Sequence, residues 1–419
     1  MKPTTKLLNK WNDIHEKIGI ICCLLMIAGL FFSRALLSLS MFVMFVNALH
    51  PRFLRQYWKE WRRNAFFMLC VAFFFSYFIS GLWSADHNYW LKATINKLPF
   101  VILPFSFLSV PLHKEKVQRL IIISLAAMQL LLIGYSLAEL ALHWNYYMKG
   151  YHFSRPIPTT KYNDHIRFSL SLVLSFFLLL YLLLEKKKDL INKSAKWILT
   201  IILCIFFVYI HILAAKSGIL CLYLGMLVFV IFKIGRKNKL LALLLTLIIA
   251  SLPFLGYIFV PTFKTKIDYV RYEQQKTKED KHYDYTLSDA GRMITYDIGI
   301  KAIKEHPVSG MGAGDLMDEM REGYRKYYPE VSEEQQFGPI NQFLFTALSV
   351  GIPLCLILLA MCIAPFFLKV NDRIYLIITA LALFISLMVE APLELQFGVF
   401  TYLFFILTWI SILKKPTVQ

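Results

Sequence analysis

The sequence predicts an all-α membrane protein with about 12 transmembrane helices and one long extracytoplasmic loop containing short helices. Of its 419 residues, 58% are hydrophobic and 17% are charged, whereas a soluble domain has about 45–50% apolar and about 25% charged residues. The apolar residues form blocks of roughly 16–25, long enough to cross a hydrocarbon core about 30 Å thick. Backbone polar groups in lipid must be bonded internally, so these blocks are expected to be helices.

Twelve apolar blocks define the expected transmembrane helices. They lie at residues 18–32, 35–49, 64–82, 94–110, 118–142, 166–184, 196–212, 217–233, 239–260, 340–367, 374–390 and 396–413. The predicted organisation is nine helices within residues 1–260, a polar loop at 261–339 and three helices within 340–419. Residues 1–17 are long and polar for a signal peptide, and no small-residue cleavage site follows. We therefore expect the first helix to be retained.

The basic residues of the short connections are distributed very unevenly. One set holds 25 Lys and Arg residues and comprises the N-terminal segment, residues 50–63, 111–119, 185–197, 233–239 and 368–373, and Lys414 with Lys415. The alternate set holds 6 and comprises residues 33–35, 83–93, 143–165, 213–217 and 391–395. Short cytoplasmic connections are enriched in Lys and Arg, so both termini are predicted to be cytoplasmic and the long loop to lie outside. This clustering also accounts for the net charge of +18 without a nucleic-acid partner.

The long loop is expected to contain two or three helices that lie on the membrane. Its first part, Lys264–Asp289, is highly charged. The segment Arg292–His306 has apolar residues at helical spacing and ends at Pro307, which favours a helix with one face buried against the bundle. A second charged, helix-like run extends to Tyr328.

A glycine-rich segment, Gly310–Gly314, lies between those two predicted helices. Its backbone N–H groups could surround a phosphate, or the glycines could supply the positive φ of a tight turn after Pro307. No strand precedes the segment, so a dinucleotide-binding motif is excluded by context. We favour the turn.

Polar side chains gather at the predicted outer membrane face. They are Lys216, Asn163, Asp164, His165, Arg167, Glu390, Glu394, Gln396, Asn341 and Gln342. Any one of them could simply extend its polar end to the interface, but charged groups at a membrane edge are costly and often functional. Their clustering on one face predicts a cationic pocket, in which Lys216, Arg167 and Arg292 could bind an anion such as phosphate.

Several motifs carry a resemblance to a known family. The run from Gly291-Arg292 through His306-Pro307 to Gly310–Asp315 resembles the loop of the O-antigen ligase and O-antigen polymerase superfamily. Asn341-Gln342-Phe343-Leu344 is similar to the start of the helix that follows that loop. The stretches 163–169 and 394–399 resemble a Bacteroidetes-like branch, and the helix count and position of the loop match as well.

The resemblance implies a metal-independent transferase of the bacterial inner membrane that uses no cofactor. Such enzymes take a glycan from an undecaprenyl diphosphate carrier on the periplasmic side. Ligases transfer it to lipid A-core or a protein hydroxyl, and polymerases transfer it to another carrier-linked repeat. The seven cysteines all lie within apolar blocks and offer no metal-binding spacing.

The resemblance also assigns expected roles to individual residues. Arg292 matches the family's loop arginine, and Lys216 lies where the family usually has arginine. Both are expected to stabilise the departing diphosphate, a role for which fixed cations are suited. The expected substrate-binding residues are Arg167, His165, Asn341, Gln342, Gly312, Gly314, Glu394 and Gln396.

One position departs from the family pattern. The histidine that usually precedes the asparagine of the post-loop helix, and is proposed to activate the acceptor, is replaced here by Ile340. Another group could serve in its place, with candidates Glu333, Glu334, His282 and His306, or transferase activity could be altered or lost.

Three functions stay open from the sequence. A ligase and a polymerase differ only in the acceptor, and no residue identifies the acceptor. A transporter or flippase of a lipid-linked anion is a different class. Transporters often show inverted repeats and broken helices near the membrane midplane, and we find no convincing internal repeat.

Overall fold

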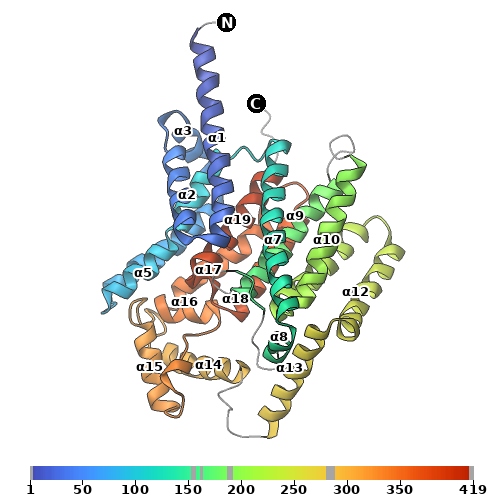
Figure 1. Ribbon diagram of the computed structural model, residues 1–419. Helices are drawn as coiled ribbons and strands as arrows, with labels where there is room; N and C mark the ends of the chain where they lie inside the picture. The colour runs from blue at the N-terminus through green and yellow to red at the C-terminus, as the bar shows by residue number, and fades with distance from the viewer. Residues whose placement is uncertain (1–2, 152–156, 161–163, 186–191, 280–287, 415–419) are drawn as a thin grey trace.

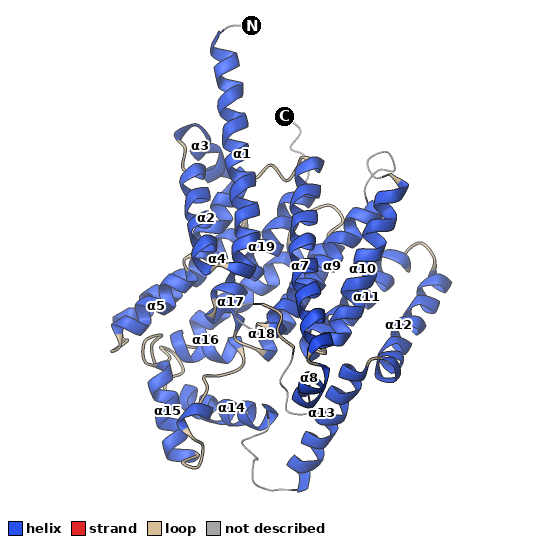
Figure 2. Cartoon of the chain, viewed as in Figure 1, coloured by secondary structure: helices blue, strands red, loops and turns tan. Residues whose placement is uncertain are grey.

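The computed structural model describes residues 3–151, 157–160, 164–185, 192–279 and 288–414. Figure 1 shows these residues as a bundle of long helices with a smaller group of helices below it. Within the described residues there are helices and loops and no strand (Figure 2). The predicted all-α fold is confirmed.

The helices that precede the long loop make up most of the bundle. In chain order they are α1 (Pro3–Phe32), α2 (Arg34–Ala48), α3 (Pro51–Trp61), α4 (Ala65–Ile79), α5 (His87–Lys97), α6 (Pro99–Ser106), α7 (Glu115–Leu142), α8 (Trp144–Tyr151), α9 (His165–Glu185), α10 (Lys193–Leu213), α11 (Lys216–Phe229) and α12 (Lys239–Phe259). Asparagines begin several of them, because the side chains of Asn64, Asn192 and Asn238 accept hydrogen bonds from first-turn amides of α4, α10 and α12. Those amides have no partner within the helix, and such a cap typically contributes about 1 kcal/mol.

The described helices are those of a multi-pass membrane protein. Nine helical segments, counted within the described residues and with α5 and α6 taken together as His87–Ser109, are long and apolar enough to cross a membrane, and α2 with α3, bent by 101°, would make a tenth span. Two further apolar helices, Ile352–Phe367 and Ile374–Val389, are shorter. The exact count of twelve therefore stays a prediction.

The centre of the bundle is formed by α9, α18 (Ile374–Val389) and α19 (Gln396–Leu413). In their most apolar 18-residue stretches, 83% of α19 and 78% of α9 are buried, against 17% of α12 at the periphery. The rings of Tyr375 in α18 and Trp409 in α19 stack at 5.2 Å, and Tyr181 of α9 meets Trp409 edge-on at 5.3 Å. These three helices thus share one core.

The single helix expected over 340–367 is divided in two. Gly351 separates α16 (Gln342–Val350) from α17 (Ile352–Ile363) and has a φ of +87°. A Cβ at this position would lie 1.9 Å from the carbonyl oxygen of Val308. The amide of Ile352 donates to the carbonyl of Pro307 at 2.9 Å. The segment of the long loop that follows α14 (Ser288–Glu305) therefore packs into the break, and only glycine permits that approach.

The long loop contains three helices, α13 (Pro261–Glu279), α14 (Ser288–Glu305) and α15 (Leu316–Tyr327). Of these, α14 and α15 pack against α16. The helix predicted over Arg292–His306 is confirmed apart from its last residue, because α14 includes that segment up to Glu305. Ile298 of α14 and Met320 of α15 share a small buried cluster with Leu348 of α16.

The structure separates the two sets of connections. The start of α1 and the end of α19 lie at one end of the bundle, and α13, α14 and α15 lie at the other (Figure 1). Ion pairs join connections of the basic set to one another, as Lys114 does with Glu16 and Lys414 with Glu60. At the other end, the carboxylate of Asp315 accepts hydrogen bonds from the amides of residues 85 and 86, both at 2.7 Å.

Candidate active site

A buried group of charged side chains lies at the loop end of the bundle. Arg167, in the first turn of α9, donates from Nη1 to Oδ1 of Asp164 at 2.6 Å. Its Nη2 lies 3.6 Å from Oε2 of Glu390, the residue that follows α18. Within the described part of the chain, Arg167 Nε and Glu390 Oε2 are buried and have no hydrogen-bond partner. One donor, Arg167 Nε, and one acceptor, Glu390 Oε2, could therefore each form a further hydrogen bond at this site.

Arg292 of α14 contributes to the same electrostatic environment. Burial raises the pKa of Glu390, while the positive charges of Arg167 and then Arg292 oppose that rise. A buried carboxylate is disfavoured in its charged form, and nearby cations favour it. Helices α9, α14 and α18 therefore bring two arginines and one buried carboxyl group to a common site.

The segment that opens α16 lies beside Glu390. The amide of Gln342 donates to the carbonyl oxygen of Glu390 at 3.0 Å. The carbonyl oxygen of Ile340 accepts a hydrogen bond from the Tyr296 hydroxyl of α14 at 3.0 Å. The position of Ile340, which lacks the family's histidine, is thus held between α14 and the residue after α18.

Asn341 holds the start of α16 in place. Its Oδ1 accepts hydrogen bonds from the amides of Phe343 and Leu344, and its Nδ2 donates to the carbonyl of Met388 at 2.9 Å. Both ends of the side chain are therefore used within the protein. A role for Asn341 in substrate binding stays a prediction.

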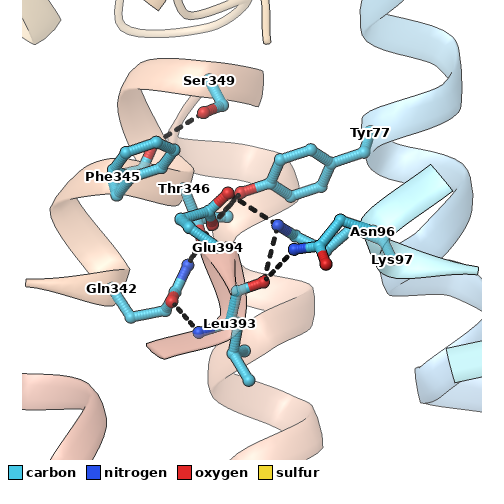
Figure 3. A network of polar contacts seen from close by, with 9 residues as sticks. All are labelled: Tyr77, Asn96, Lys97, Gln342, Phe345, Thr346, Ser349, Leu393 and Glu394. Carbon is cyan, nitrogen blue, oxygen red and sulfur yellow. Dashed lines mark hydrogen bonds and ion pairs between the residues drawn. The ribbon is translucent and has the colours of Figure 1, made fainter. Parts of the chain in front are cut away.

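A second polar network includes Gln342, at the start of α16, and Glu394, in the turn before α19 (Figure 3). Lys97 is fully buried and donates to Glu394 Oε2 at 2.7 Å and to the carbonyl oxygen of Leu393 at 2.9 Å. The other carboxylate oxygen of Glu394 accepts hydrogen bonds from Gln342 Nε2 at 2.7 Å and from the Tyr77 hydroxyl at 3.3 Å. Gln342 and Glu394 thus connect α4, α5, α16 and the turn before α19.

Lys97 has no assigned role in the sequence interpretation, although one signal was available. It is a lysine close to the start of an apolar block, and a buried lysine needs a partner. The Lys97 ammonium also lies 4.5 Å from the centroid of the Tyr77 ring, which adds a cation–π contact. What the sequence could not supply is that its partner is Glu394, almost 300 residues away.

The remaining predicted residues lie at the same end of the bundle. Lys216 is exposed in the first turn of α11. Helix α11 packs closely against α9 at Gly218, because a Cβ at this position would lie 1.9 Å from the Ser169 hydroxyl. His165, half-buried, begins α9. Gln396 donates to the Ser38 hydroxyl at 2.6 Å.

The glycine-rich segment packs against the turn that precedes α5. Gly310 and Gly312 have φ values of +67° and +96°, as the turn interpretation requires. The amide of Gly314 donates to Ser84 Oγ at 3.1 Å. A Cβ at Gly312 would lie 2.6 Å from the same oxygen. A substrate-binding role for Gly312 and Gly314 stays a prediction.

The proposed substitutes for the missing histidine lie elsewhere. Glu333 and Glu334 are exposed in a short 3-10 turn, and His306 is exposed after α14. His282 lies outside the described residues, as does Asn163. Glu390, which the sequence placed at the outer turn without a catalytic role, has a buried carboxyl group, and its backbone carbonyl binds the amide of Gln342, two residues after Ile340.

The fold and the site define a multi-pass α-helical membrane protein with a buried arginine–carboxylate site under a loop helix. Residues 199–359 match the family model described as O-Antigen ligase. This match covers less than half of the chain, and it supports the resemblance to the O-antigen ligase superfamily, whose members are ligase-like or polymerase-like glycosyltransferases. The match runs from α10 to α17, so it includes Lys216, Arg292, Ile340 and Gln342. A search of curated proteins finds no match to the chain.

Proposed function

We propose that the protein transfers a glycan from an undecaprenyl diphosphate carrier to lipid A-core or another hydroxyl acceptor at the periplasmic face of a bacterial inner membrane. The observation that supports this best is the convergence of Arg167, Arg292 and Glu390 from three helices. A site for a lipid diphosphate needs fixed cations at the membrane edge and a group able to accept a proton. This group of side chains supplies both.

The cations act on the leaving group. The acceptor oxygen attacks the anomeric carbon, the bond from that carbon to the diphosphate oxygen breaks, and the diphosphate leaves with the electron pair. Arg292 and Lys216 are proposed to stabilise the charge that grows on it. Fixed donors aimed at developing charge typically contribute about 10²–10³-fold each to turnover.

Glu390 is proposed to accept the proton of the acceptor hydroxyl. Ile340 cannot take a proton, whereas the Glu390 carboxyl group is buried nearby and its Oε2 makes no hydrogen bond within the described residues. Burial raises the pKa of this group, which makes its carboxylate a better base than an exposed one. Arg167, at 3.6 Å, would then hold the carboxylate in position.

The test is transfer by the purified full-length protein from a glycan-loaded lipid diphosphate. Arg292→Ala should lower turnover about 10²–10³-fold, with a smaller effect on donor binding, because the contact strengthens as the diphosphate departs. Arg321→Ala is the matched control, since this arginine lies on the neighbouring α15 and pairs with the exposed Asp318. Equal turnover of the Arg292→Ala variant and the unaltered protein would refute the proposal.

The choice of acceptor separates ligase from polymerase. Offering lipid A-core in one reaction and a second carrier-linked repeat in another tests the two acceptors directly. A product formed only on lipid A-core identifies the ligase, and a lengthened carrier-linked chain identifies the polymerase.

A further inference from the structure

A cavity of about 390 Å³ opens at the end of the bundle opposite the candidate active site. One wall comes from the region after α11, with Phe232, Lys233 and Arg236. The other comes from the start of α18 and the connection before it, with Arg373 and Ile374. The cavity belongs to the end whose connections carry most of the basic residues of the chain.

The cavity holds two arginines whose charge is not balanced within the structure. Lys233 is bound by Glu185 at 3.0 Å and by Asp372 at 2.8 Å, a group with a net charge of −1, so the two arginines leave this part of the structure with a net positive charge. Arg236 and Arg373 are exposed, and their guanidinium groups have no ion-pair partner in the described part of the chain. Paired arginines without a carboxylate partner attract phosphate, which they can bind in a bidentate manner.

The local backbone holds this wall in an unusual shape. α11 continues into a π-helical turn, Val230–Ile234, where the amide of Gly235 donates to the carbonyl of Val230. π-helical turns are rare and are frequent at functional sites. Asp372, with a φ of +41°, holds the opposite wall through its ion pair with Lys233. The two walls are therefore joined by this ion pair at the side of the cavity.

The remainder of the cavity lining is apolar and continues into the membrane-facing surface. Phe232 is 52% exposed and the adjacent Ile231 is 53% exposed. Ile374 extends the apolar wall on the α18 side. Arg236 lies just past the end of the span Lys216–Ile234, so it is at the height of lipid headgroups. A soluble phosphate would need the arginines alone, whereas a phospholipid would use both the arginines and the apolar wall.

We propose that this cavity binds the phosphate headgroup of an anionic phospholipid, with an acyl chain along Phe232. Basic pockets between transmembrane helices on the cytoplasmic side are suited to anionic headgroups. The site is separate from the proposed transfer site and does not depend on the proposed activity.

The test is lipid binding by the delipidated full-length protein in detergent. The protein is titrated with phosphatidylglycerol, with phosphatidylcholine and with inorganic phosphate, and retained lipid is counted by native mass spectrometry. Phosphatidylglycerol should bind and phosphatidylcholine should not. Removing one arginine, as in Arg236→Gln or Arg373→Gln, should weaken binding about fivefold, and the double variant about 25-fold.

The matched control for the double variant is Lys237→Gln with Lys239→Gln, which removes the same charge at the same end of the bundle but from residues that do not line the cavity. This control should bind phosphatidylglycerol as the unaltered protein does. Equal weakening of the control and the arginine variant would refute the site, because the attraction would then be general. Equally tight binding of inorganic phosphate would refute the assignment to a lipid.

Discussion

Glu390 combines burial, two neighbouring arginines and a carboxylate oxygen, Oε2, that accepts no hydrogen bond within the described residues. The sequence places it at an outer turn, but its environment is created by α9 and α14, which are distant along the chain. Arg167 was predicted to lie at the site, but the sequence does not show that Glu390, which is distant along the chain, is its partner. Side-chain identity is local information, whereas burial and pairing depend on the folded bundle.

Glu390→Gln should lower glycan transfer about 10²–10⁴-fold, the usual contribution of a general base. Because burial raises the pKa of Glu390, the unaltered protein should lose activity as pH falls through a midpoint above about 4.3, the ordinary value for glutamate. The variant should lack this dependence. Turnover measured across pH, with the exposed Glu333→Gln as control, checks the prediction. An unchanged profile in Glu390→Gln would rule out the proton-accepting role.

Lys97 and Glu394 should matter for stability. Lys97→Met leaves the Glu394 carboxylate in a largely buried position without its cation, and should lower the free energy of unfolding by about 3–5 kcal/mol. The double variant Lys97→Met, Glu394→Gln should recover most of that loss, since no uncompensated charge remains. Thermal unfolding in detergent measures both, with the exposed Lys92→Met as control. A double variant as unstable as the single one would contradict this account.

At the scale of elements, apolar blocks predict where helices form but not where they break. The boundary between α16 and α17 lies inside an apolar run that includes Gly351, and a glycine in such a run does not by itself identify a break. The break exists because Pro307 and Val308 pack against it. This contact joins the middle of the long loop, just after α14, to the helices that follow the loop, so it depends on tertiary packing. The segment Arg292–Ile303 was predictable as a helix because its apolar spacing is local.

Gly351→Ala should destabilise the protein by about 1–3 kcal/mol through backbone strain alone, and by more if Val308 cannot shift. The control is Gly134→Ala in α7, where a Cβ would meet nothing within 4 Å. That substitution should be neutral or stabilising by up to about 1 kcal/mol, because alanine favours a helix interior. Comparing the two unfolding temperatures tests the proposed packing, and equal temperatures would contradict it.

At the scale of the whole molecule, the distribution of Lys and Arg predicts that the connections divide between two ends of the bundle, and the contacts support that division. Lys233 joins Glu185 and Asp372, all three from connections of the basic set. Tyr296 of the loop binds the backbone at Ile340, at the opposite end. The sequence could predict this partition because the bias of Lys and Arg is a property of short connections. It could not predict which helices are central, because all of the apolar blocks look alike.

Reporter fusions at Lys237 and at Lys326 should report opposite sides of the membrane, with Lys237 in the cytoplasm. The expectation rests on the 25-to-6 distribution of basic residues. A reporter active only in the cytoplasm and a second active only in the periplasm give independent readings at each position. The same side for both positions would overturn the topology.

The burial of α19 has a consequence for how the protein is made. This helix is the most enclosed of the candidate spans in the described residues, yet it follows all the other described helices in the chain. Synthesis proceeds from the N-terminus, so α1 to α18 are made before α19. Until α19 is inserted, its place at the centre of the bundle is occupied by lipid or by the other helices. Tyr181 and Tyr375 meet Trp409 only after that interval. Assembly of the core is thus a late event in biogenesis, and the nascent bundle is exposed to quality control until α19 is inserted.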